Sequence, residues 1–177
     1  MSNRVVYLMR GLPACGKSFT ARKLAGATGI VCETDEYFYT QVGDDPRRYD
    51  YRAELLPQAR QWCFERFRQA LEEGLTPVVV DRGNGRNLES QQFARCAVEY
   101  GYRLELAEPE SEWWQEIRVL LKYKQHTSEV LHRWADTLAE KSRTTHRVPA
   151  ATIRHWMDHW HSGLTVEEIL DYTEPTA

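Results

Sequence analysis

The stretch GLPACGKS, residues 11–18, decides the fold because of what stands on either side of it. The apolar run VVYLM at residues 5–9 comes before it and predicts a buried strand. The run KSFTARKLA at residues 17–25 is rich in helix formers and is followed by glycine, which predicts a helix. The two glycines between them allow backbone angles that turn successive N–H groups toward one point. The positive end of the helix faces the same point, so we expect this loop to bind an anion.

The spacing G-x-x-x-x-G-K-S is that of a phosphate-binding P-loop. In such a loop Lys17 reaches the β- and γ-phosphates of a nucleoside triphosphate, and the Ser18 hydroxyl completes the shell of a magnesium ion. We therefore expect ATP and Mg²⁺ as cofactors. The residues expected to surround the phosphates are Gly11, Leu12, Pro13, Ala14, Cys15, Gly16, Lys17, Ser18 and Phe19.

Strand-like and helix-like runs alternate after this loop. Apolar runs at residues 30–33, 77–80 and 103–107 predict three more strands, and the amphipathic runs between them predict helices. This alternation predicts an α/β fold in which helices cover both faces of a parallel sheet.

The chain has 177 residues and no stretch that resembles an interdomain linker. We expect one domain over residues 1–177, with a nucleotide-binding core at residues 1–110. The sequence of residues 111–177 predicts only helices. We expect the first of them to form a lid and the others to be the C-terminal helices.

Composition excludes several classes of protein. With 23 basic and 26 acidic side chains the net charge is −3, so any site for a polyanion must be local. No run approaches the roughly 18 apolar residues that a membrane span needs, and the N-terminus has no signal-peptide pattern. The four cysteines lie far apart without a CxxC pair, which favours reduced thiols and a cytoplasmic protein.

Carboxylates follow two of the predicted strands, where ligands bind in open parallel sheets. Asp81 directly after one strand is typical of a group that holds magnesium or its water shell, although aspartate is also common as a helix or loop cap. Asp35 after another strand can accept the proton of an attacking hydroxyl, ligate the metal, or act as a cap. Glu36 beside it is the second candidate for the base.

The motifs GLPACGKS, TDEYF, DRGN and EYGYRLELAEPE follow one another in this order. The ordered set resembles the polynucleotide 5′-hydroxyl kinase branch of the P-loop kinases, an AAA-type ATP-binding and zeta-toxin-related group. The resemblance covers most of the chain. It implies a three-layer P-loop NTPase fold with strand order 2-3-1-4, and an ATP-dependent kinase.

The resemblance also implies roles for individual residues. Gly11, Gly16, Lys17 and Ser18 match the cradle for the ATP phosphates. Asp35 matches the aspartate that takes the proton of the 5′-hydroxyl, and Asp81 and Asn84 match the polar pair that flanks the acceptor channel. In the segment EKSRTTHRVP, Arg143 is the first match for a lid arginine that braces the γ-phosphate and Arg147 is the second. A solvated basic helix end is the alternative for both arginines.

The sequence departs from the family pattern at one place near the acceptor. The phage-type enzyme has an arginine three residues after its catalytic aspartate, and this chain has Phe38 there. The segment DPRRYDYR offers three candidates that could meet an acceptor phosphate instead, Arg47, Arg48 and Arg52. They stand next to Tyr49 and Tyr51, which could stack on a base. A solvated surface turn is the other interpretation of this segment.

The acceptor that we expect first is the 5′-hydroxyl end of DNA or RNA. A small-molecule kinase of the same group is an alternative, and so is an ATP-binding switch or ATPase domain with little kinase activity. We expect no membrane partner, and the sequence predicts no protein partner.

Overall fold

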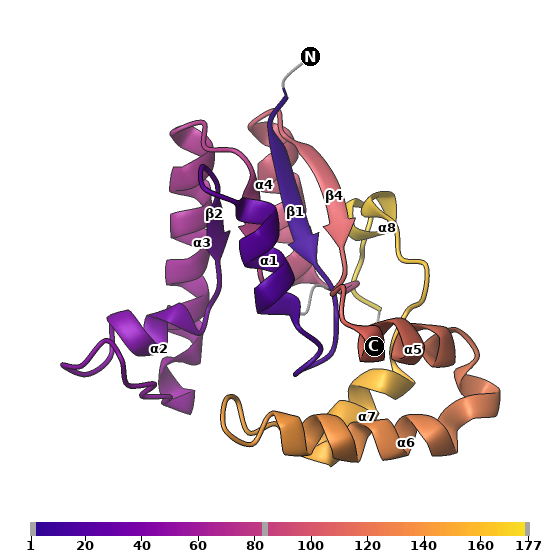
Figure 1. Cartoon of the computed structure of the whole chain (residues 1–177). Helices are drawn as coiled ribbons and strands as arrows, with labels where there is room; N and C mark the ends of the chain where they lie inside the picture. The colour runs from indigo at the N-terminus through magenta and orange to yellow at the C-terminus, as the bar shows by residue number, and fades with distance from the viewer. Residues whose placement is uncertain (1–2, 83–84, 176–177) are drawn as a thin grey trace.

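The computed structural model describes residues 3–82 and 85–175 (Figure 1). Strands and helices alternate through the first part of the chain, and the second part is helical. The elements are β1 (Val5–Met9), α1 (Lys17–Ala25), β2 (Ile30–Cys32), α2 (Glu36–Thr40), the 3₁₀ helix η1 (Ala53–Leu55), α3 (Leu56–Glu72), β3 (Val78–Val80), α4 (Leu88–Glu99), β4 (Arg103–Ala107), α5 (Glu112–Lys122), α6 (Lys124–Lys141), α7 (Ala150–Asp158) and α8 (Val166–Leu170).

The four strands form one parallel sheet in the order β2-β3-β1-β4. Val6 pairs with Val78 and with Leu104, and Ile30 also pairs with Val78, so β1 and β3 lie in the middle. The predicted α/β class and the 2-3-1-4 order are therefore confirmed. Because all strands run the same way, their carboxyl ends meet at one edge, which faces the region between α2 and α6 in Figure 1.

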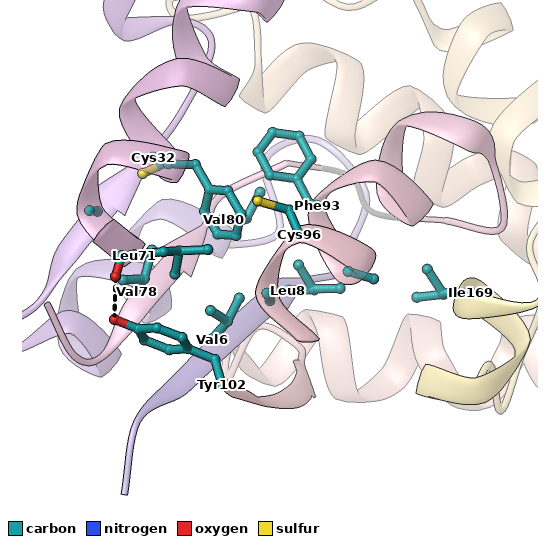
Figure 2. Close-up of a cluster of buried hydrophobic side chains, with 14 of the residues drawn as sticks. Val6, Leu8, Cys32, Leu71, Val78, Val80, Phe93, Cys96, Tyr102 and Ile169 are labelled. Atoms are coloured by element: carbon teal, nitrogen blue, oxygen red, sulfur yellow. Dashed lines mark hydrogen bonds between the residues drawn. The ribbon is translucent and has the colours of Figure 1, made fainter. Parts of the chain in front are cut away.

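Helices cover the two faces of the sheet because the side chains of β1 alternate between them. Val6 and Leu8 point into a core shared with α3, α4 and α8, and Figure 2 shows Phe93 and Ile169 among the side chains of this cluster. Met9 points to the opposite face, where α1 packs. The result is a three-layer arrangement with the P-loop at the carboxyl edge.

A second core joins the P-loop to the helical part of the chain. Leu12 and Cys15 are fully buried against α5, α6 and α7, and Trp114, Ile117 and Ile153 contribute to the same cluster. The loop is thus packed on one side by helices that follow it by about a hundred residues.

The predicted elements agree closely with the observed ones. The strands at residues 5–9 and 103–107 have the predicted bounds. The observed β2 and β3 are each one residue shorter than the strands predicted at residues 30–33 and 77–80. Pro77 lies outside β3 because proline has no N–H to donate to a ladder, and Glu33 lies outside β2 because it turns to the carboxyl edge. No helix in the described part of the chain is long and apolar enough to cross a membrane.

Candidate functional site

The P-loop has the backbone of an anion-binding loop. Gly16 at the N-terminal cap of α1 has φ 87°, in the left-handed region, and Ala14 has φ 57°. No side chain caps α1, and its first turn holds no acidic residue. The amides of that turn are therefore not engaged by a side-chain cap, and the helix dipole adds positive potential in front of them.

The start of α5 fixes the outer side of the loop. The Ser111 hydroxyl donates a hydrogen bond to the carbonyl of Cys15 at 2.8 Å, and the indole N–H of Trp113 donates to the carbonyl of Ala14 at 3.0 Å. A β-carbon on Gly11 would lie 2.8 Å from Pro109, so only glycine fits between them. These contacts hold the carbonyls away from the loop interior, and the sequence analysis did not foresee them.

Lys17 lies among the carboxylates of the carboxyl edge. Its ammonium donates to the carbonyl of Leu12 at 3.2 Å. Burial lowers the pKa of Lys17, and the negative charges of Asp81 and Asp35 act in the opposite direction. The predicted phosphate-binding lysine and the two predicted carboxylates are thus close enough to interact.

Glu33 joins this group, although the sequence analysis placed it in a strand. Asp81 is buried, and its backbone N–H donates to the carbonyl of Cys32 at 3.0 Å. Burial, together with the charges of Asp81 and Asp35, raises the pKa of Glu33 to about 7. A polar residue at the end of an apolar run was the signal that could have identified it.

The oxygen donors at this edge fit a magnesium ion. Ser18 supplies a hydroxyl, and Asp81 and Glu33 supply carboxylates, which are the ligand types that Mg²⁺ prefers. Within residues 3–82 and 85–175, no three His, Cys, Asp or Glu side chains come together as a metal site. Mg²⁺ usually keeps several waters and shares phosphate oxygens, so this donor set suits an ion bound together with a nucleotide.

Asp35 stands at the rim of the site with its side chain 41% exposed. It precedes α2 but caps no helical N–H with its side chain. Instead, the hydroxyl of Tyr49 donates to Asp35 Oδ1 at 3.0 Å, and His146 Nδ1 lies 3.3 Å from Oδ2. Burial and the charge of Asp35 raise the pKa of Tyr49, so the phenol remains a donor to the carboxylate.

Two neighbours of Asp35 face other directions. Glu36, the second candidate for the base, forms an ion pair with Arg66 of α3. Phe38, which replaces the family arginine, is fully buried between α2 and α3. Of these three side chains, only that of Asp35 lies at the rim of the site.

The predicted cations of the lid and of the acceptor side lie on the surface. Arg143 is 73% exposed and pairs with Glu140 at 3.3 Å. Arg147 is exposed and has φ 51° in the loop between α6 and α7. Among the described residues, neither arginine forms a hydrogen bond or ion pair with Lys17, Asp35 or Asp81. Arg48 is exposed in the loop after α2.

A further cation beside the P-loop is one that the sequence analysis did not single out. The Lys141 ammonium lies 4.8 Å from the centroid of the Trp113 ring, and its charge acts on the pKa of Cys15. Burial outweighs that effect and raises the pKa of Cys15 to about 12, so the thiol in the loop stays protonated. Phe19 is 71% exposed on the first turn of α1. Asn84 lies outside the described residues.

Several known proteins contain a segment that is similar in sequence to part of this chain. Human NEDD4-binding protein 2 is 31% identical over 113 residues, which are 63% of this chain and 6% of that protein. Human YLP motif-containing protein 1 is 29% identical over 126 residues, covering 59% of this chain and 6% of that protein. The rat protein of the latter name is 28% identical over 126 residues, 59% of this chain and 9% of its own length. The chain therefore spans less than a tenth of these relatives.

A family profile described as "AAA domain" matches residues 6–159, from the first strand through α7. The match includes the P-loop, all four strands of the sheet apart from Val5, and the helices that pack against the loop. Because it runs through most of the chain, the chain belongs to the AAA domain family and carries a P-loop nucleotide-binding, kinase-like domain.

Proposed function

We propose that this protein is an ATP-dependent phosphotransferase that moves the γ-phosphate to a hydroxyl, with the 5′-hydroxyl end of DNA or RNA as its acceptor. The observation that supports this most is the position of Asp35. Its carboxylate is half-exposed at the rim, it caps no helix, and its charge acts on Lys17 of the P-loop. A carboxylate placed across from a phosphate cradle is what transfer to an alcohol requires.

In the proposed reaction the P-loop amides and Lys17 hold the triphosphate. Ser18 and Asp81, with Glu33 beside them, would hold a magnesium ion, which neutralises charge on the phosphates when bound. Asp35 orients the acceptor and takes its proton. The acceptor oxygen then bonds to the γ-phosphorus while the bond from that phosphorus to the bridging oxygen breaks, and ADP leaves.

A cation from the lid would brace the transferring phosphoryl group. Arg143 is the proposed residue, with Arg147 as the second candidate. Both lie in the loop after α6, which already reaches the site because His146 contacts Asp35. Lys141, which already lies beside the loop, is the third cation in reach. Asn84 and Arg48 stay proposals for the acceptor channel.

A screen with γ-labelled ATP tests the proposal. We expect label on 5′-hydroxyl oligonucleotides of DNA or RNA and none on the same oligonucleotides with a 5′-phosphate. Hydrolysis of ATP with no labelled product, whatever hydroxyl is offered, would contradict a kinase and favour the ATPase or switch domain.

A small-molecule kinase is the second candidate, and one observation favours it. Two of the three cations of the loop after α2 pair within it, Arg47 with Asp45 at 3.0 Å and Arg52 with Asp50 at 2.9 Å. Salt separates the two candidates, since contacts to polynucleotide phosphates weaken steeply as salt rises. An acceptor KM that does not change between 50 and 200 mM salt would favour a small acceptor.

A further inference from the structure

Three tyrosine side chains gather beside Asp35 and form what we call the tyrosine cluster: Tyr39, Tyr49 and Tyr51. The ring centroids of Tyr39 and Tyr49 lie 5.0 Å apart, and those of Tyr49 and Tyr51 lie 6.1 Å apart with nearly parallel planes at 17°. Tyr39 is 39% exposed and Tyr51 is 50% exposed. The cluster therefore offers ring surface to solvent next to the proposed base.

The cluster rests on a buried support. Phe38 is fully buried and its ring centroid lies 4.9 Å from that of Tyr51. Val42 and Ala59 complete this small core between α2 and α3. Rings held in this way lose little freedom when they bind a ligand, which favours binding.

Two contacts tie the cluster to Asp35. Tyr49 donates its hydroxyl to Asp35 at 3.0 Å, and His146 contacts both the Asp35 carboxylate and the edge of the Tyr49 ring, at a centroid distance of 6.3 Å. A carboxylate and an aromatic surface thus lie side by side. In a terminal nucleoside the 5′-hydroxyl and the base stand on one sugar, which matches this arrangement.

The charges of the loop around the tyrosine cluster favour a ligand with an aromatic ring over a ligand with a run of phosphates. Residues 44–54 carry four acidic and three basic side chains. Two of the three cations are paired within the loop, Arg47 with Asp45 and Arg52 with Asp50. Stacking of a base on aromatic side chains is insensitive to the identity of the base, and it does not need unpaired cations as phosphate binding does.

We propose that the tyrosine cluster is a subsite on which the base of the acceptor's terminal nucleoside stacks, so that its 5′-hydroxyl meets Asp35. This rests on the proposed function, and it assigns the acceptor to the class of nucleoside-bearing molecules. Tyr51 provides the exposed ring, whereas Tyr49 links the subsite to the carboxylate.

The test compares two 5′-hydroxyl oligonucleotides that differ only in whether the first residue carries a base or is abasic. For the unaltered protein the KM of the intact acceptor should be lower by at least about fivefold, the range expected for one stacked base. Tyr51→Ala should remove this difference and leave the KM of ATP unchanged, whereas Tyr51→Phe should retain it.

Tyr123→Ala is the matched control, because Tyr123 is 53% exposed at the junction of α5 and α6, far from α2 in Figure 1. Binding of both oligonucleotides by fluorescence anisotropy, with a non-hydrolysable ATP analogue, gives the same comparison without turnover. Transfer to both acceptors with equal KM would overturn the subsite and leave the proposed function standing. Transfer to neither would overturn both.

Discussion

At the scale of single residues, the phosphate loop depends on glycine in two different ways. Gly11 is required because Pro109 leaves no room for a β-carbon. Gly16 is required because its φ of 87° lies where a β-carbon causes strain, although space is available around it. Glycine is therefore needed at one end of the loop for lack of space and at the other end for its backbone conformation.

Gly16→Ala should lower the free energy of unfolding by about 1–2 kcal/mol and weaken ATP binding, because the strained residue turns the loop amides. Gly101→Ala is the control, since Gly101 has φ 75° with open space around it and lies between α4 and β4. Denaturant unfolding and calorimetric titration with ATP check this. If both variants lost ATP affinity equally, the loss at Gly16 would reflect general destabilisation instead of loop geometry.

At the scale of elements, α5 acts as the outer wall of the P-loop. Ser111 and Trp113 donate to two successive carbonyls of the loop, and Lys141 of α6 lies over the Trp113 ring. An oxygen turned outward leaves the neighbouring amide free to turn inward, so these donors help to shape the anion site.

Trp113→Phe keeps an aromatic side chain but removes the indole N–H that donates to Ala14. We expect ATP affinity to fall by roughly fivefold, which corresponds to one hydrogen bond of about 1 kcal/mol. Trp134→Phe is the control, because it removes an indole hydrogen bond to Glu116 on the outer side of the helices. Equal ATP affinity in the Trp113→Phe and unaltered proteins would show that the loop holds its shape without this donor.

At the scale of the whole molecule, the sequence predicted what depends on residue type at fixed spacing. The strands and the parallel sheet were confirmed, and so was the strand order that the family resemblance implied. The structure placed Asp35 and Asp81 at one edge with Lys17, as expected from strand ends in a parallel sheet.

Other features could not be predicted, for physical reasons. Ser111 and Trp113 donate to backbone carbonyls. Every residue has such a carbonyl, so the sequence does not indicate which one a side chain contacts. His146 reaches Asp35 across more than a hundred residues of chain, so the contact depends on the path of the loop after α6. Arg143, by contrast, pairs on the surface with Glu140 three residues before it, which agrees with the alternative of a solvated basic helix end.

Asp35 and the P-loop lie on separate elements of the carboxyl edge, and we propose that they act on one phosphoryl group. Single-turnover transfer from γ-labelled ATP to a 5′-hydroxyl oligonucleotide, measured for Asp35→Asn, tests it most directly. We expect ATP binding to stay nearly unchanged and the transfer rate to fall by roughly a hundredfold or more, with the exposed control Asp158→Asn unaffected. A transfer rate within about threefold of the unaltered protein would contradict the assignment of Asp35 as the base, since removal of a general base costs far more than that.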